Sequence, residues 1–210
     1  AAFERAYAEY CGSRYCVMVN SGSSANLLMV AAWTLHHGAG IVCVPALGWA
    51  TSYFPFQQYG WKLRFVDIDR ATLNYDLAAL WRACEADDVD LILAINVLGN
   101  PNEFKGFPRR PHVLEDNCEA MGAEYERHRT GTFGVMSSHS TFFSHHICTM
   151  EGGMVTTDDE TFYHALLALR SHGWTRHLPQ PNAFGEKRED WRFILPGYNV
   201  RPTEMQAAIG

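Results

Sequence analysis

The 210-residue chain lacks the features that mark several common protein classes. It contains no apolar run close to the about 18 residues that a membrane-spanning helix requires. It has no excess of positive charge either, because 17 lysines and arginines stand against 23 acidic residues. The resulting net charge of −6 argues against binding to nucleic acids or membrane surfaces by charge alone. We therefore expect neither nucleic acid nor membrane as a partner.

The cysteines lack the spacing of a metal site or a disulfide framework. Six of them are scattered along the chain without a C-x-x-C pair, which is typical of reduced, mostly buried thiols in a cytoplasmic protein. We therefore expect a cytoplasmic location and no bound metal. A G-x-G-x-x-G motif is also absent, which argues against a nicotinamide dinucleotide fold.

Apolar segments of strand length alternate with segments of helical periodicity. The strands are predicted at residues 15–19, 41–45, 61–67, 90–97, 111–116, 137–143 and 154–157. The helices are predicted at residues 1–11, 27–33, 54–59, 77–84 and 162–169. This alternation predicts an α/β fold, with a sheet covered by helices on both faces. We expect one large domain over residues 1–210, and we interpret the chain as a fragment because it begins and ends inside predicted helices.

A turn of small residues, 20–26, lies between the first predicted strand and an apolar helix. The first N–H groups of a helix are unpaired and its dipole favours negative charge, so such a turn can bind an anion. Gly22 would let a phosphate approach the backbone, and Ser23 would add a hydroxyl donor. Taken alone, this motif is more often an ordinary helix N-cap.

Three further candidates lie at or just after the carboxyl ends of predicted strands, where open α/β sheets bind ligands. Trp49 follows the second strand and could stack on a flat ring, although a tryptophan is more often simply packed. Asp116 and Glu119 follow a buried strand, although an acidic cluster is usually just solvated. A carboxylate beside a pyridine nitrogen keeps that nitrogen protonated and makes the ring an electron sink. We favour Asp116 for this role and Glu119 for a second polar contact.

The segment 140–153 contains further candidate site residues. Ser140 lies five residues before His145, and a Gly-Gly pair ends the segment. Imidazole titrates close to neutral pH, which suits a general base. The chain thus offers a phosphate anchor, a carboxylate and a base, the three groups that an aromatic amine cofactor needs.

Several motifs together resemble the DegT/DnrJ/EryC1/StrS family of sugar aminotransferases. They lie in the same order along the whole chain, at residues 20–26, 116–122, 140–145, 151–153 and 197–210. The resemblance implies the large domain of a fold-type I pyridoxal-phosphate-dependent transferase, with a mixed, mostly parallel sheet between helices. It also implies a missing C-terminal small domain and a homodimer with shared active sites.

The resemblance assigns roles to individual residues around pyridoxal 5'-phosphate or pyridoxamine 5'-phosphate. It implies phosphate contacts from Gly22, Ser23 and Ser140, ring contacts from Trp49, Asp116 and Glu119, a contact from Asn199 to the partner subunit's cofactor, and glutamate or sugar contacts from His172 and Arg201. It leaves His139 and His146 as structural residues, with His146 pointing away and packed.

Lysine is the residue that binds the cofactor in this family, and its position is taken here by His145. The only lysines of the chain, Lys62, Lys105 and Lys187, lie elsewhere. Histidine cannot form the covalent link, so the resemblance implies a noncovalently held amine form, pyridoxamine phosphate. Residues 142–153 and 170–176 are similar to family members that remove the C3 hydroxyl of GDP-4-keto-6-deoxy-D-mannose. They imply a glutamate-dependent hydro-lyase of colitose and O-antigen biosynthesis, with His145 as the base.

Three alternatives remain open. A CDP-4-keto-6-deoxyglucose 3-dehydrase also has histidine here, but it carries an iron–sulfur cluster held by cysteines, and Cys148 is the only cysteine after His145. A sugar-nucleotide aminotransferase would need the missing lysine. An inactive cofactor-binding paralogue is disfavoured by the presence of Asp116, Ser140 and His145.

Overall fold

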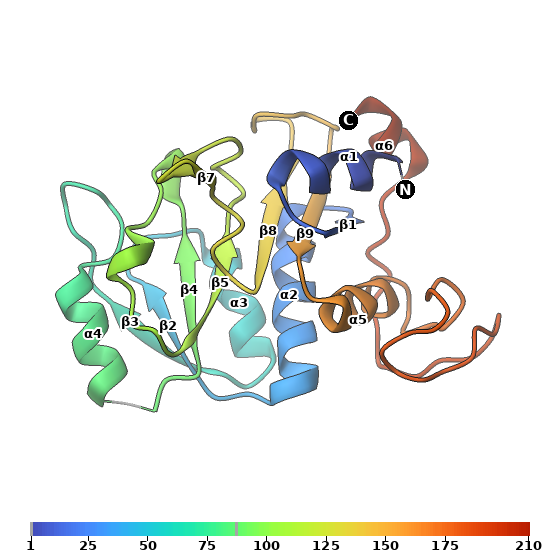
Figure 1. The fold of residues 1–210 in the computed structure, drawn as a ribbon, viewed down its shortest axis with the longest axis horizontal. Helices are drawn as coiled ribbons and strands as arrows, with labels where there is room; N and C mark the ends of the chain where they lie inside the picture. Colours follow the sequence, from blue (N-terminus) through green and yellow to red (C-terminus); the bar gives the residue numbers. More distant parts are fainter. Residues whose placement is uncertain (1, 87) are drawn as a thin grey trace.

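A seven-stranded sheet organises the protein, whose computed structural model describes residues 2–86 and 88–210 (Figure 1). The strand order is β1-β9-β8-β5-β4-β2-β3. The strands are β1 (Tyr15–Val19), β2 (Ile41–Pro45), β3 (Lys62–Val66), β4 (Leu91–Ile95), β5 (His112–Asp116), β8 (Met136–Ser140) and β9 (Gly153–Thr157). β9 pairs antiparallel with both β1 and β8, whereas the other pairings are parallel. The predicted mixed, mostly parallel sheet is confirmed.

Helices cover both faces of this sheet, as the sequence predicts. They are α1 (Ala2–Cys11), α2 (Gly22–His37), α3 (Ala50–Gln58), α4 (Leu77–Ala86), α5 (Glu160–Arg170) and α6 (Glu204–Ile209), with short 3-10 turns η1 (Val97–Gly99) and η2 (Phe104–Gly106). Alternation along each strand decides which helices it meets. Val17 and Val19 of β1 join the core with α2 and α5, whereas Cys16 and Met18 face α1. The two faces therefore have separate cores.

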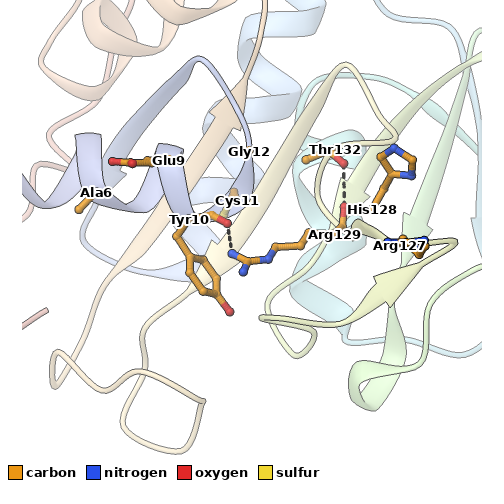
Figure 2. Close-up of a pocket in the computed structure, with 9 residues that line it drawn as sticks. All are labelled: Ala6, Glu9, Tyr10, Cys11, Gly12, Arg127, His128, Arg129 and Thr132. Carbon is orange, nitrogen blue, oxygen red and sulfur yellow. Dashed lines mark hydrogen bonds between the residues drawn. The ribbon is translucent and has the colours of Figure 1, made fainter.

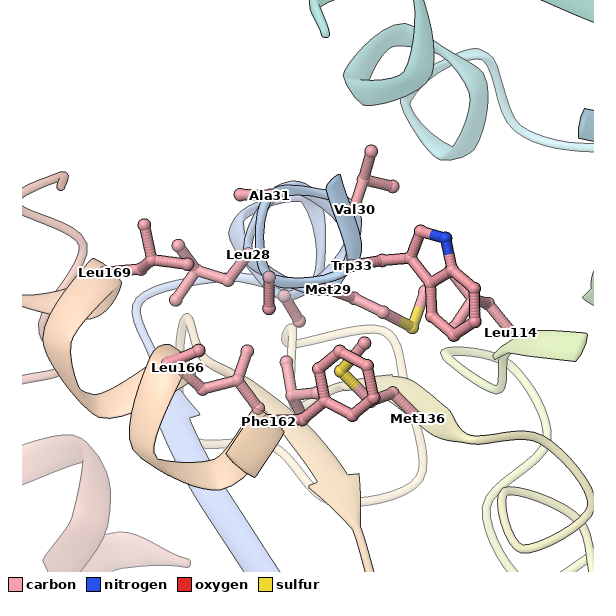
Figure 3. Close-up of a cluster of buried hydrophobic side chains, with 14 of the residues drawn as sticks. Leu28, Met29, Val30, Ala31, Trp33, Leu114, Met136, Phe162, Leu166 and Leu169 are labelled. Atoms are coloured by element: carbon pink, nitrogen blue, oxygen red, sulfur yellow. The ribbon is translucent and has the colours of Figure 1, made fainter. Parts of the chain in front are cut away.

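The helix α2 is the centre of the larger core. It is apolar around most of its circumference, which is the pattern of a helix buried on several sides. In Figure 3 the helix packs against Phe162 and Leu166 of α5 on one side and against Leu114 of β5 and Met136 of β8 on the other. The ring of Trp33 stacks on Phe162 at 5.7 Å between centroids. This packing fixes the N-terminus of α2 over the ends of the strands.

Several local predictions differ from the structure: the strand predicted at 137–143 ends at Ser140, and the helix predicted at 54–59 begins at Ala50. The helix α2 begins at Gly22 and not at residue 27, so the small-residue turn is mostly the first turn of the helix itself. The hairpin of β6 (Glu124–Tyr125) and β7 (His128–Arg129) was not predicted. Its two turn residues, Glu126 and Arg127, have φ values of 50° and 68°. Such turns usually carry Asn-Gly, and residues 126–127 lack that signal.

The short helix α6 lies beside the segment that joins β8 and β9. Thr203 caps this helix in a capping box with Gln206. The Gln206 Nε2 also donates a hydrogen bond of 2.7 Å to the carbonyl of Glu151, which ties α6 to the segment that joins β8 and β9. None of the described helices is long and apolar enough to cross a membrane.

Candidate active site

Most of the predicted site residues gather at one edge of the sheet. The carboxyl ends of β1, β2, β5 and β8 lie at this edge because these strands run in parallel (Figure 1). Gly22 follows β1, Trp49 follows β2, Asp116 ends β5, Glu119 follows it, and Ser140 ends β8. The antiparallel strand β9 starts at the same edge.

The first turn of α2 lies directly against Ser140. Ser21 caps the helix by accepting a hydrogen bond from the Ser24 N–H. A Cβ atom on Gly22 would lie 2.7 Å from Ser140 Cβ and 3.1 Å from Cys118 Sγ. Only glycine fits at this distance, so the end of β8 lies against the helix backbone, beside its positive dipole end. The exposed Ser23 side chain lies 3.2 Å from the Thr51 hydroxyl of α3.

Asp116 is buried, with 5% of its surface exposed, and its carboxylate is held by three donors. Oδ2 accepts hydrogen bonds from Asn26 Nδ2 at 2.8 Å and from Ser52 Oγ at 2.6 Å. Oδ1 accepts one from the Cys118 N–H at 3.1 Å. Asn26 in turn accepts a bond of 2.7 Å from the Ser138 hydroxyl. A buried carboxylate requires such partners.

Sequence reasoning missed three members of this network: Asn26, Ser52 and Ser138. One signal was available, because Asn26 is a polar residue in an otherwise apolar stretch of α2. The two serines offered none, since a buried serine has the same local pattern as an exposed one.

The structure separates the acidic residues that the sequence groups together. Glu115 is fully buried and accepts three hydrogen bonds of 2.7 Å from backbone N–H groups of residues 131–134. Burial raises the pKa of Glu115, and these hydrogen bonds oppose that effect. Glu119 accepts a hydrogen bond of 2.9 Å from the N–H of Leu98, a residue with left-handed φ. Glu115 therefore holds a loop, and Glu119 orders the turn after β4.

His145 lies on the irregular segment between β8 and β9. The ends of this segment are joined by a bond from the Thr149 N–H to the Thr141 carbonyl at 2.9 Å. The His145 N–H bonds to the Phe142 carbonyl, and the two rings lie 6.0 Å apart. His145 is half-buried, whereas His146 is exposed, so the expectation that His146 packs is wrong.

His139 is a structural residue, as predicted. It is 1% exposed, and its Nε2 lies 3.0 Å from the Thr156 hydroxyl on the neighbouring strand. Burial lowers the pKa of His139 to about 4, although the charge of Asp116 opposes this shift. The imidazole is therefore neutral at physiological pH and takes no part in proton transfer.

None of the three lysines takes the position of His145. Lys62 opens β3 and lies at the opposite edge of the sheet. Lys105 forms an ion pair with Glu126, and Lys187 is exposed on the 179–190 stretch. Within the described residues, none of the three forms a hydrogen bond or ion pair with Asp116 or His145.

Segments at 171–172 and 199–201 lie side by side near the start of α2. The Asn20 N–H donates to the Val200 carbonyl at 3.0 Å, which places residues 199–201 beside the turn before the helix. Ser171 pairs with Asn199 and accepts a hydrogen bond of 2.8 Å from Arg201. The His172 N–H donates to the Tyr198 carbonyl. The structure thus brings Asn199, Arg201 and His172 together, without a hydrogen bond from any of them to Asp116 in the described part of the chain.

Trp49 is 72% exposed and immediately precedes α3. Its carbonyl accepts a hydrogen bond of 3.0 Å from the N–H of Ser52, the residue that binds Asp116. The side chain of Trp49 is therefore free to contact a ligand next to Asp116.

A cavity of about 790 Å³ lies elsewhere, between α1 and the β6–β7 hairpin (Figure 2). Arg129 crosses it, with its guanidinium 3.8 Å from the centre of the Tyr10 ring and a hydrogen bond to the Tyr10 carbonyl. None of the predicted site residues lines this cavity. The candidate site is the strand-end cluster and not this cavity.

Comparison with known proteins assigns the family. The model of the DegT/DnrJ/EryC1/StrS aminotransferase family matches residues 1–210. The chain belongs to this family. Over 225 residues, this family member is 51% identical to a GDP-4-keto-6-deoxy-D-mannose 3-dehydratase of Yersinia pseudotuberculosis. The alignment covers 99% of the chain and 57% of that relative, so the chain spans less than two thirds of the relative's length.

Solved structures of family members agree with the fold described above. An E. coli GDP-4-keto-6-deoxy-D-mannose 3-dehydratase with bound hydrated PLP superposes with a TM-score of 0.94 at 48% identity, covering 99% of this chain and 57% of that one. A GDP-4-keto-6-deoxymannose 3-dehydratase with a trapped PLP–glutamate geminal diamine gives a TM-score of 0.93 at 48% identity, with 99% and 58% coverage. The chain therefore has the fold of a PLP-dependent aminotransferase large domain.

Proposed function

We propose that residues 1–210 form the large domain of a sugar-nucleotide 3-dehydratase, a hydro-lyase. Its substrate is GDP-4-keto-6-deoxy-D-mannose, its cofactor alternates between pyridoxamine and pyridoxal 5'-phosphate, and its amino donor is L-glutamate. The 51% identical relative is a dehydratase of this kind, and the two similar structures contain PLP and a PLP–glutamate adduct, which supports this assignment. The observation that carries it is the half-buried His145 on the segment after Ser140, with no lysine of the chain in that position.

The residues at the strand ends fit such a cofactor. The first turn of α2 lies beside Ser140, at a contact so close that Gly22 has no room for a Cβ atom. A phosphate is the anion that such a helix start binds best. Asp116 offers a buried carboxylate for a ring nitrogen, held in place by hydrogen bonds from Asn26 and Ser52 to its Oδ2. Trp49 and Glu119 would contact the ring, and Ser23 the phosphate.

The proposed role of each residue follows from the chemistry of its side chain. When bound, the cofactor supplies an electron sink through its protonated pyridine ring. Asp116 keeps that ring nitrogen protonated. His145 accepts and returns a proton at the cofactor's C4′ carbon, a role that suits an imidazole near neutral pH. His172 and Arg201 bind the carboxylates of glutamate or the sugar hydroxyls.

The overall reaction balances without any further reactant. The sugar loses its C3 hydroxyl as water and gains hydrogen at C3, which is a two-electron reduction. Glutamate supplies these electrons as it becomes 2-oxoglutarate and releases ammonia. The product, a 3-deoxy-4-keto sugar nucleotide, is a precursor of colitose in O-antigen synthesis.

The assembly belongs to the same proposal. We place the enzyme in the cytoplasm as a homodimer with shared active sites, in which Asn199 reaches the cofactor of the partner subunit. Asn199 is exposed and lies beside the start of α2, where a contact across a subunit boundary is possible.

The test uses the full-length protein with pyridoxamine phosphate, L-glutamate and GDP-4-keto-6-deoxymannose. We expect equal amounts of 2-oxoglutarate, ammonia and a sugar nucleotide that has lost its C3 hydroxyl, identified by mass spectrometry and NMR. An amino sugar that keeps the C3 hydroxyl would indicate an aminotransferase instead. Cofactor binding without turnover of either GDP or CDP substrates would indicate an inactive paralogue.

A further inference from the structure

We propose that Asn26, Ser52 and Ser138 are positioning residues that orient the Asp116 carboxylate toward the cofactor ring. The three residues lie on different elements, α2, α3 and β8, and are separated from Asp116 by 90, 64 and 22 residues. The inference rests on the proposed function, because the orientation of Asp116 matters only if a pyridine ring binds there.

The burial of the network shows that it is built into the fold. Asn26, Ser52 and Ser138 are 3%, 2% and 0% exposed. Polar groups at this depth are destabilising unless they are hydrogen-bonded. Each of them has such a bond, and the bonds form a chain from Ser138 through Asn26 to Asp116, with Ser52 as a second branch.

The distribution of donors distinguishes the two carboxylate oxygens. A carboxylate oxygen has two lone-pair positions. Both positions of Oδ2 are used, by Asn26 and Ser52. Within the described residues, Oδ1 accepts a strong hydrogen bond only from the backbone N–H of Cys118, because the remaining hydrogen-bond partner of the carboxylate, the Cys118 thiol, is a weak donor. The geometry therefore points to Oδ1 of Asp116 as the oxygen that receives the N–H of the cofactor ring.

Ser138 acts through Asn26 by fixing the direction of its amide. The serine hydroxyl donates to Asn26 Oδ1 at 2.7 Å, which leaves the amide NH₂ facing Asp116 at 2.8 Å. Without this hydroxyl the amide can rotate and present its oxygen to the carboxylate, which is repulsive. Loss of Ser138 should therefore disturb Asp116 although the two side chains share no hydrogen bond in the described residues.

The neighbouring residue on β8 provides a matched control. Ser137 is also 0% exposed, and its hydroxyl has no hydrogen-bond partner within the described residues. Serine to alanine removes the same atom at both positions. A general effect of removing a buried hydroxyl from β8 would appear in both variants, whereas an effect on Asp116 would appear only at Ser138.

The experiment compares Ser138→Ala, Ser137→Ala and Ser52→Ala in the full-length protein. Two quantities are measured: the dissociation constant for pyridoxamine phosphate, and the pH at which the absorbance of the bound ring reports loss of the nitrogen proton. For Ser138→Ala and Ser52→Ala we expect binding weaker by about tenfold and deprotonation at lower pH, since hydrogen bonds to charged groups are the strong ones. For Ser137→Ala we expect parental values of both.

The outcomes separate this inference from the proposed function. If the parent protein does not bind pyridoxamine phosphate, the proposed function fails and this inference fails with it. If the parent binds the cofactor and all three variants keep parental affinity and titration, or change equally, the positioning role is wrong while the function stands. Should Ser138→Ala not fold, Ser52→Ala on a separate element decides by the same two measurements.

Discussion

Acidification should destabilise the protein through the buried imidazole of His139. Burial lowers its pKa from the ordinary 6.5 to about 4, so the unfolded chain binds a proton at a higher pH than the folded one. The stability that comes from keeping His139 neutral is therefore fully present above pH 6.5 and is lost as the pH falls toward 4.

The size of this effect follows from the two pKa values. Each pKa unit corresponds to about 1.4 kcal/mol. At about pH 4.5 the unfolded imidazole is almost fully protonated and the folded one mostly neutral, which gives a loss of roughly 2–3 kcal/mol. A residue that is 1% exposed has no solvent contact to weaken this effect. A loss of this size is a large part of the stability of a typical domain.

Urea denaturation at about pH 7 and about pH 4.5 measures the loss. The parent is compared with His139→Gln, which cannot be protonated, and with His128→Gln, whose histidine is exposed on β7. Other titrating groups remain in every variant and cancel in the differences. We expect the parent and His128→Gln to lose roughly 2–3 kcal/mol more on acidification than His139→Gln does. Equal losses in all three proteins would refute the assignment.

Three further predictions concern the strand ends. Gly22→Ala places a methyl group 2.7 Å from Ser140 Cβ. We expect thermal unfolding to show a free energy of unfolding lower by about 1–3 kcal/mol, and titration to show weaker binding of pyridoxamine phosphate. Parental values of both would contradict the close contact. Glu115→Gln turns an amide donor toward the backbone N–H groups of residues 131–134. Urea denaturation should therefore show a free energy of unfolding lower by about 1–3 kcal/mol. An unchanged denaturation midpoint would show that these hydrogen bonds contribute little to stability. Asp116→Asn should lower dehydratase turnover by about 100-fold, the equivalent of roughly 3 kcal/mol, and unchanged turnover would remove Asp116 from the mechanism.

The sheet and the location of the site were predictable from local patterns. Segments of strand length correctly located the seven main strands, and the buried strands β2 and β4 were the clearest because a strand buried on both faces needs few polar residues. The parallel order then placed Gly22, Asp116 and Ser140 at one edge. The roles of the neighbours Glu115 and Asp116 were not separated in this way, although their carboxylates bind different parts of the structure.

The contacts that orient the site were not predictable in this way. The bonds from Asn26 and Ser52 to Asp116 join residues 90 and 64 positions apart, and no local periodicity encodes such pairs. The β6–β7 hairpin was missed because its left-handed turn residues, Glu126 and Arg127, are not those that turn statistics favour. The hydrogen bonds to Asp116 and the hairpin both depend on packing between distant segments, and not on the local pattern of each segment.

The central claim is that His145 takes the position of the lysine that binds the cofactor in other family members. The most direct test incubates the full-length protein with one equivalent of pyridoxal phosphate, reduces it with borohydride and maps the modified peptides by mass spectrometry. We predict no covalently attached cofactor in the parent, and attachment at position 145 in His145→Lys. A cofactor bound to Lys62, Lys105 or Lys187 in the parent would contradict it.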